Sequence, residues 1–264
     1  MKFFNQCLSG LALLCFVSFT AIANTTIFLA GDSTVQDVNP EKSADMGWGQ
    51  RLPEIVSNKN VFIDNHAKGG RSTRTFIEEG RWERMIALVN EGDWVFLQFG
   101  HNDQAYDYPD RYTSPKAYYT NLNRFISDIR QKKANPVLIT PVSRRYFDKN
   151  NELRDAHGMY PEIVRVLGRR TDTPVIDLTA TSWQRFINLG PEKSKVLFNY
   201  HETGADKRHP EGISDDTHFS PAGSLDMAKL VVAEIQQQKI APLDSFFTSQ
   251  QFDDIDFETP FGFR

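Results

Sequence analysis

Cysteine is almost absent from the sequence. Its only two cysteines, Cys7 and Cys15, lie in an N-terminal stretch with the composition of a secretory leader. A positive residue, Lys2, and an apolar run over 8–22 precede a pattern of small residues that ends at Ala23. We therefore expect residues 1–23 to be a signal peptide, cleaved after Ala23, that directs a secreted or periplasmic protein. Without this leader the chain has no thiol, which excludes a cysteine nucleophile, a thiolate metal site and a disulfide.

Long apolar runs and an excess of positive charge are also missing. After the leader, no uncharged stretch approaches the roughly 20 residues that span a bilayer. The 30 Lys and Arg against 34 Asp and Glu give a net charge of −4, which repels nucleic acid and anionic membranes. There is no glycine-rich phosphate loop, and the histidines lack a metal-ligand spacing. We expect no nucleic-acid or membrane partner, no cofactor and no metal.

Short apolar runs alternate with segments of helical period over 24–264, which we interpret as one domain. Five of the runs are almost continuously apolar, as in parallel strands covered on both faces. Two helices are predicted to begin at Ser114-Pro115 and Ser220-Pro221, where a capping residue precedes proline. The alternation predicts an α/β fold, a three-layer α/β/α sandwich with a central five-stranded parallel sheet. The predicted strands are 27–30, 61–63, 94–99, 137–140 and 175–178.

Four segments show no clear period. Segments 103–113, 144–157 and 199–217 are rich in polar and aromatic residues, and we expect them to be loops that line a site. The tail, about 244–264, contains six phenylalanines and is predicted to wrap over the domain surface.

Chemically informative residues follow three of the predicted strands. The first strand runs into Gly-Asp-Ser-Thr at 31–34, the second into Gly-Gly-Arg-Ser at 69–72, and the third into Gly-His-Asn-Asp at 100–103. Asp-Asp-Thr-His at 215–218 precedes the last predicted helix. Ligands bind beyond the carboxyl ends of parallel strands. A serine there is a candidate nucleophile, histidine and aspartate its base and orienting partner, and glycine and asparagine donors to an oxyanion.

These four blocks in this order resemble the SGNH (GDSL-like) hydrolases, and more closely their rhamnogalacturonan acetylesterase branch than the lipases. Gly-Asp-Ser-Thr stands here where Gly-Asp-Ser-Leu is commoner. Gly-Trp-Gly at 47–49 and Pro-Val-Ser-Arg-Arg at 141–145 complete the likeness, which extends from Ile27 to about residue 240. The resemblance implies a flavodoxin-like sandwich and a serine ester hydrolase that needs no cofactor.

The resemblance also implies roles for particular residues. Ser33 would be the nucleophile, His218 the general base and Asp215 its partner. The Ser33 and Gly70 N–H groups and the Asn102 side-chain amide would form the oxyanion hole. The residues alone leave two alternatives open, because Asp216 adjoins Asp215 and Gly69 adjoins Gly70. Five residues are candidate substrate contacts. The Trp48 ring could stack on a sugar, and the guanidinium groups of Arg71, Arg74 and Arg144 could bind galacturonate carboxylates. The His157 imidazole could also line the cleft.

The resulting hypothesis is a serine esterase that removes O-acetyl groups from a plant cell-wall polysaccharide, with rhamnogalacturonan the substrate that the resemblance favours. Its partner would be an acetylated polysaccharide or oligosaccharide. One alternative is an SGNH esterase or lipase that acts on other acyl esters or on acetylated xylan. Another is a carbohydrate-binding protein without catalytic activity. The sequence leaves the oligomeric state open.

Overall fold

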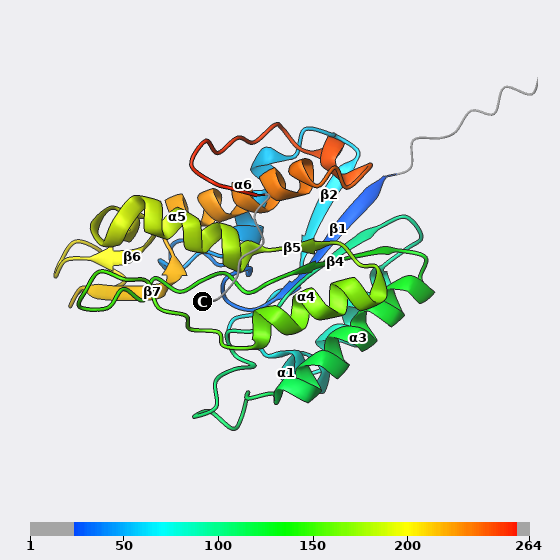
Figure 1. The fold of residues 1–264 in the computed structure, drawn as a ribbon, viewed down its shortest axis with the longest axis horizontal. Helices are drawn as coiled ribbons and strands as arrows, with labels where there is room; N and C mark the ends of the chain where they lie inside the picture. Colours follow the sequence, from blue (N-terminus) through cyan, green and yellow to red (C-terminus); the bar gives the residue numbers. More distant parts are fainter. Residues whose placement is uncertain (1–23, 258–264) are drawn as a thin grey trace, which may run out of the picture.

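Five parallel strands form a central sheet whose two faces are covered by helices (Figure 1). The computed structural model describes residues 24–257, so the predicted leader and the last residues of the tail lie outside the described part. The strand order β2-β1-β3-β4-β5 confirms the predicted three-layer sandwich. The strands are β1 (Thr25–Gly31), β2 (Val61–Asn65), β3 (Trp94–Gln98), β4 (Asn135–Ile139) and β5 (Val175–Ile176).

Strands β1, β3 and β4 are apolar on both sides because each face of the sheet packs on its own core. Along β1, Ile27 and Leu29 belong to one core, and Phe28 and Ala30 belong to the other. Helices α1 to α4 pack on the second core, whereas α5, α6 and the 3₁₀ helix η1 pack on the first (Figure 1). The bounds are α1 (Thr73–Glu78), α2 (Arg81–Leu88), α3 (Pro115–Gln131), α4 (Tyr160–Thr171), α5 (Leu178–Lys193), α6 (Pro221–Gln237) and η1 (Trp48–Ile55).

Side-chain caps fix where several helices begin. The Ser114 hydroxyl accepts a hydrogen bond from the Ala117 N–H at 3.3 Å, and the Ser220 hydroxyl accepts one from the Gly223 N–H at 3.1 Å. Both predicted helix starts are therefore confirmed. The predicted strand over 175–178 is too long, because the Asp177 carboxylate caps α5 and ends β5 before it.

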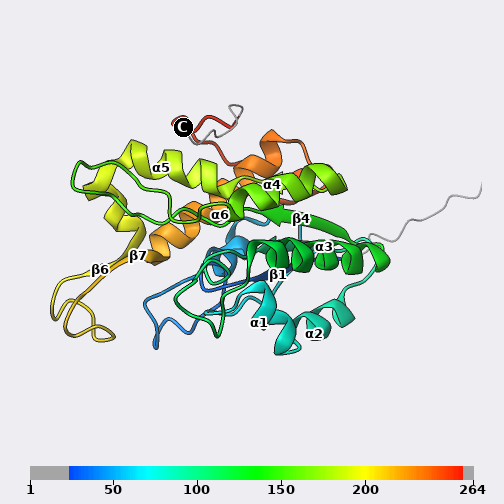
Figure 2. The ribbon, with the colours of Figure 1, turned by 60° about the horizontal axis from the view of Figure 1, so that its bottom comes forward.

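Segment 199–217 is not the irregular loop that its composition predicts. It forms most of an antiparallel hairpin of β6 (Phe198–His201) and β7 (Ile213–Phe219), which follows the short 3₁₀ helix η2 (Ser194–Leu197). Phe198 and Phe219 pair at its base and are buried in the first core, while the connecting loop extends away from the sheet (Figure 2). Two short strands of mixed polarity carry too little periodicity to be predicted.

The chain after α6 returns across the domain. The 3₁₀ helix η3 (Leu243–Phe246) is followed by Phe247, which forms an isolated bridge with Val56. The Ser57 N–H donates to the Phe246 carbonyl at 2.9 Å, and both phenylalanines are buried. This part of the predicted tail thus contributes to the core instead of only covering it.

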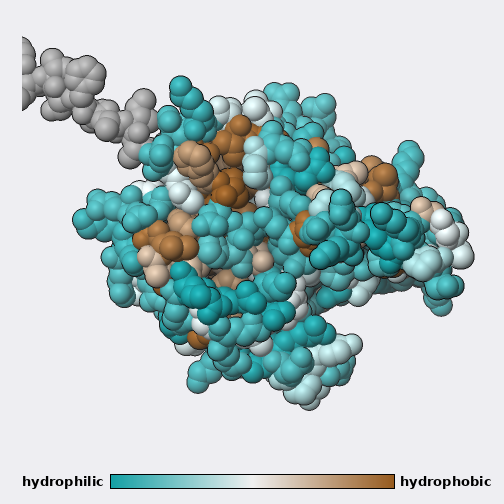
Figure 3. Space-filling view, turned by 180° about the vertical axis from the view of Figure 1, so that it is seen from behind, coloured by the Kyte–Doolittle hydropathy of each residue, from teal (hydrophilic) through white to brown (hydrophobic). Residues whose placement is uncertain are grey.

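The surface is mainly hydrophilic on the face shown in Figure 3, with apolar residues in small separate patches. Within residues 24–257, no helix combines the length and the apolar character needed to cross a bilayer.

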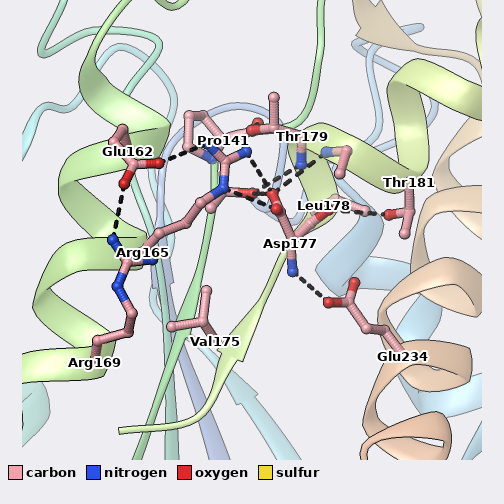
Figure 4. Close-up of polar contacts among 12 residues, drawn as sticks. Pro141, Glu162, Arg165, Arg169, Val175, Asp177, Leu178, Thr179, Thr181 and Glu234 are labelled. Carbon is pink, nitrogen blue, oxygen red and sulfur yellow. Dashed lines mark hydrogen bonds and ion pairs between the residues drawn. The ribbon is translucent and has the colours of Figure 1, made fainter. Parts of the chain in front are cut away.

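A partly buried polar network around Asp177, the capping residue of α5, joins α4 to α6 (Figure 4). The Arg165 guanidinium donates two hydrogen bonds to Asp177, at 2.8 and 2.9 Å, and the Thr140 hydroxyl donates a third at 3.0 Å. The Asp177 N–H in turn donates to Glu234 Oε1 at 2.6 Å. Glu234 is 6% exposed, and its other carboxyl oxygen has no hydrogen-bond partner within the described residues. Burial raises the pKa of Glu234 to about 8, so this carboxyl is protonated at neutral pH.

We predict that Glu234→Gln stabilises the protein at high pH. The raised pKa favours folding at low pH, and this contribution is lost as pH rises from 4.5, the ordinary value, to about 8. The amide keeps the Oε1 acceptor and never ionises, so the variant should gain about 1–3 kcal/mol over the natural chain at pH 8 and little at pH 4. Urea unfolding from pH 4 to 9 measures the difference, with the exposed Glu41→Gln as control. A difference that does not grow with pH would contradict the prediction.

Candidate active site

A cleft of about 1070 Å³ lies at the end of the sheet where β1 and β3 finish. It is lined by residues of all four motif blocks, among them Ser33, Gly70, Asn102 and His218. Segments 103–113 and 144–157 also line it, as predicted. The sheet therefore brings together residues that are up to 185 positions apart in the sequence.

Ser33, His218 and Asp215 form a continuous hydrogen-bonded line on the cleft. His218 Nε2 lies 3.0 Å from the Ser33 hydroxyl, and His218 Nδ1 lies 2.7 Å from Asp215 Oδ2. The other carboxylate oxygen of Asp215 accepts the Thr217 and His218 N–H groups at 2.7 and 2.9 Å. With the Nδ1 proton directed at Asp215, Nε2 is the acceptor for the serine proton. The arrangement can activate a hydroxyl as a nucleophile.

The electrostatics of the pair favour a proton on the imidazole. Burial lowers the pKa of His218, but the hydrogen bond and the negative charge of Asp215 outweigh it and raise the pKa above its usual value. Burial raises the pKa of Asp215, yet its contacts with His218 lower it to about 2. Asp215 is thus ionised over the whole range in which His218 exchanges a proton.

Asp216, the alternative left open by the sequence, has a different partner. Its carboxylate pairs with the buried Arg145, whose own N–H donates to the Asp216 carbonyl at 2.9 Å. The Tyr200 hydroxyl donates to the same carboxylate. Asp216 therefore ties β7 to the 144–157 segment, and the neighbouring Asp215 is the carboxylate that contacts His218.

The second alternative, Gly69 or Gly70, is distinguished by backbone hydrogen bonding. The Gly69 N–H donates to Gln36 Oε1 at 2.7 Å. The Gly70 N–H has no acceptor within the described residues, and Gly70 lines the cleft. Its φ of +79° lies in the left-handed region that favours glycine. Gly70 is therefore the one of the two whose N–H is available to a ligand.

Asn102 and Ser33 offer further donors at the same place. One amide hydrogen of Asn102 goes to the Arg71 carbonyl at 3.2 Å, which leaves the other for a ligand. The Ser33 N–H has no acceptor in the described part of the chain. Asp103, next to Asn102, is buried and accepts the Thr73 N–H at 2.9 Å and its hydroxyl at 2.6 Å. This contact holds the end of β3 against the start of α1, and so holds Asn102 beside the glycine loop.

The position of Trp48 contradicts its predicted role. It was predicted as a substrate contact, but its side chain is fully buried and does not line the cleft. Its indole N–H donates to Gln98 Oε1 at 2.7 Å, and Gln98 Nε2 donates to the Thr34 hydroxyl at 2.6 Å. That hydroxyl donates to Asp32 at 2.8 Å. Trp48 therefore supports the turn that carries the serine from behind, and the prediction of a sugar contact is wrong.

The other predicted substrate contacts divide into two groups. Arg71 and Arg74 do not line the cleft: Arg71 pairs with Glu79, and Arg74 pairs with Glu78. Arg144 and His157 do line it. His157 is buried, with Nδ1 at 2.8 Å from Gln104 Oε1 and Nε2 at 2.7 Å from the Val142 carbonyl, so both ring nitrogens have protein partners.

Asp45 lies close to the Asp215–His218 pair. One ligand atom each of Asp45, Asp215 and His218 lies within 4.8 Å of the others, so the three residues could hold a cation. Asp45 also accepts a hydrogen bond from Asn199 Nδ2 at 2.6 Å. Its negative charge adds to that of Asp215 in raising the pKa of His218. Sequence analysis missed Asp45, because no motif marks a residue that approaches the site from a separate loop.

Several other cleft residues were also missed. His101, in the third motif block, is buried with its Nδ1 3.5 Å from Asp32 Oδ2, and its ring lies 4.6 Å from that of His157. Burial lowers the pKa of His101, which keeps it neutral. Further lining residues without an earlier assignment are Gln36, Gln104, Arg111, Tyr146 and Met159. The aperiodic segments 103–113 and 144–157 could have signalled Gln104, Arg111 and Tyr146, but no pattern marks Gln36 or Met159.

Comparison with known proteins agrees with this geometry. The sequence profile of the GDSL-like lipase/acylhydrolase family matches residues 29–224. The chain belongs to this family. As a GDSL-like acylhydrolase, the protein is a carboxylic ester hydrolase, and the resemblance carried by the four blocks is confirmed.

Two curated relatives match nearly their full length. The rhamnogalacturonan acetylesterase RhgT of Bacillus subtilis (strain 168) is 40% identical over 226 residues, which cover 85% of this acylhydrolase and 95% of RhgT. The probable rhamnogalacturonan acetylesterase YesY of the same strain is 37% identical over 80% of this chain and 92% of its own.

Solved structures share the fold. The crystal structure of YxiM from Bacillus subtilis has a TM-score of 0.71 and 29% identity, over 83% of this chain and 58% of that longer one. The acetylxylan esterase Axe2 of Geobacillus stearothermophilus has a TM-score of 0.59 and 18% identity, over 80% of this chain and 93% of its own. The second likeness is one of fold alone.

We predict that Asp215→Asn moves the acid limb of the pH–rate profile. If neutral His218 is the base, kcat/KM should rise with pH through an ionisation above the usual histidine value, because Asp215 raises that pKa. Without the carboxylate, the limb should shift to lower pH, and kcat should fall by roughly 10²–10⁴-fold. Profiles with p-nitrophenyl acetate measure both effects. Asp253→Asn, at an exposed aspartate outside the cleft, is the control and should leave the limb in place; an unmoved limb in Asp215→Asn would refute the assignment.

Proposed function

We propose that this GDSL-like acylhydrolase is an exported serine esterase that removes O-acetyl groups from pectic polysaccharide, with acetylated rhamnogalacturonan as its substrate. The observation that carries the proposal is the hydrogen-bonded line from Asp215 through His218 to Ser33, which opens on a cleft with free oxyanion donors. The relatives RhgT and YesY support the choice of substrate. The predicted leader supports export, because the polymer is outside the cell.

The proposed reaction is a two-step acyl transfer. His218 Nε2 takes the Ser33 proton as the hydroxyl oxygen attacks the acetyl carbonyl, and Asp215 stabilises the imidazolium that forms. The N–H groups of Ser33 and Gly70 and the Asn102 amide then donate to the developing oxyanion. His218 returns the proton to the departing sugar oxygen, which leaves an acetyl-serine. Water, deprotonated by the same imidazole, releases acetate and restores the serine.

The character of the cleft favours a sugar over a fatty acyl chain. Its lining is mostly polar and aromatic, and its aliphatic members are Ala105, Ala156 and Met159. Three lining tyrosines are exposed, by 77, 55 and 43%, although large apolar rings are usually buried. Exposed rings at a polar cleft are suited to stacking on the apolar faces of sugars. These tyrosines are Tyr106, Tyr108 and Tyr146.

We predict that Ser33→Ala abolishes acetate release. The alanine removes the nucleophile while the surrounding hydrogen bonds of the turn remain, so kcat should fall by at least about 10³-fold without loss of folding. Acetate release would be measured side by side from acetylated rhamnogalacturonan, homogalacturonan and xylan. The exposed Ser249→Ala is the control. Near-normal rates in Ser33→Ala would defeat the mechanism, whereas faster acetate release from xylan, or faster hydrolysis of octanoyl than of acetyl p-nitrophenyl esters, would replace the proposed substrate.

A second prediction tests the oxyanion hole. Asn102→Ala should lower kcat by roughly 10²-fold, because the amide donates to the transition state more strongly than to the bound ester. KM should change little. The measurement is steady-state kinetics with p-nitrophenyl acetate, together with circular dichroism to establish folding. A variant that raises KM and keeps kcat would assign Asn102 to ground-state binding instead.

A further inference from the structure

The two arginines that line the cleft, Arg111 and Arg144, have no ion-pair partner among residues 24–257. Arginines close to the cleft that do not line it are all paired: Arg71 with Glu79, Arg74 with Glu78 and Arg145 with Asp216. The arginines that surround the site are thus each paired with a carboxylate, whereas the two that line the cleft have no carboxylate partner within the described residues.

One side of the Arg144 guanidinium group has no hydrogen-bond partner within the described residues. Its Nη1 donates to the hydroxyl groups of Thr217 and Tyr146, the latter at 3.2 Å. Its Nε and Nη2 have no acceptor within the described residues, and these two N–H groups form the edge that matches the two oxygens of a carboxylate. Thr217 precedes the catalytic His218, so this edge stands next to the reacting centre.

Arg111 is the second open guanidinium. Its group lies 4.3 Å from the centre of the Tyr108 ring, which orients it by stacking. The Arg111 Nε is buried without a hydrogen-bond partner in the described part of the chain. The Nη groups of Arg111 also have no acceptor within the described residues, and unlike Nε they are not buried, so a carboxylate in the cleft can approach them.

Two carboxylates also line the cleft, but neither pairs with these arginines. The oxygens of Asp155 accept the N–H groups of His157 and Gly158 at 2.9 and 3.0 Å. Asp107 is exposed on the 103–113 segment. Because the whole chain carries a net charge of −4, an acidic polymer needs local positive charge to approach.

We propose that Arg144 and Arg111 form a subsite for a carboxylate, so that the enzyme recognises a uronate of the acetylated polymer. Arg144 binds the carboxylate bidentately next to the scissile ester, and Arg111 binds a carboxylate at the rim. This proposal rests on the proposed function, since it names the group that distinguishes an acidic from a neutral polysaccharide.

The test combines changes in the enzyme with changes in the substrate and compares the effect of each on the other. Acetate release is measured on acetylated rhamnogalacturonan oligosaccharides and on the same oligosaccharides with their uronate carboxyl groups methyl-esterified. We expect the natural enzyme to prefer the free acid by about 10-fold or more in kcat/KM at low salt, and less at high salt. Arg144→Gln and Arg111→Gln should each remove most of this preference, and Arg144→Lys should restore only part of it, because lysine cannot bind bidentately.

Arg170→Gln is the matched control, because Arg170 is an exposed arginine at the end of α4, outside the cleft, and its loss changes the net charge equally. It should keep the full preference for the free acid. Equal rates on acid and ester by the natural enzyme, or an undiminished preference in both Gln variants, would overturn the subsite while acetate release still supported the proposed function. Turnover of p-nitrophenyl acetate without acetate release from either oligosaccharide would overturn both proposals.

Discussion

The candidate active site depends on a hydrogen bond between two residues 185 positions apart, His218 and Ser33. Ser33 follows β1 of the main sheet, and His218 lies on β7, which is not part of that sheet. The base of β7 must therefore be fixed to the body of the domain. Phe219 is buried in the first core, its carbonyl accepts the Met46 N–H at 3.1 Å, and Arg145 pairs with Asp216 farther along the strand. These contacts set the distance at which the imidazole meets the serine.

A second layer of contacts lies behind the serine. Four buried side chains form this layer, and each is hydrogen-bonded to the next in the order Trp48, Gln98, Thr34 and Asp32. Buried polar groups that are paired in this way hold one conformation, because any shift would leave a donor or an acceptor without a partner. A rigid turn of this kind keeps Ser33 in place without help from a ligand.

The sequence predicted what local patterns encode. Continuous apolar runs gave the five strands, the serine–proline pairs gave two helix starts, and the motif blocks at strand ends gave the residues that meet on the cleft. It failed where long-range packing decides. The β6–β7 hairpin has no periodic pattern, and Trp48 looks the same in sequence whether it faces sugar or the core. Arg111 and Asp45 lie in aperiodic loops, whose positions depend on contacts that no local pattern records. Whether an arginine is paired can likewise be read only from the structure, as Arg144 and its neighbour Arg145 illustrate.

Asp215 and His218 have a further property that follows from their backbone. Besides contacting the imidazole, the carboxylate accepts the N–H groups of Thr217 and His218 in the same strand, so carboxylate and imidazole are held together within four consecutive residues. The connection between β6 and β7 contributes none of these atoms. A change in its length therefore leaves the contact between Asp215 and His218 intact, so this loop can vary in evolution while the pair stays assembled.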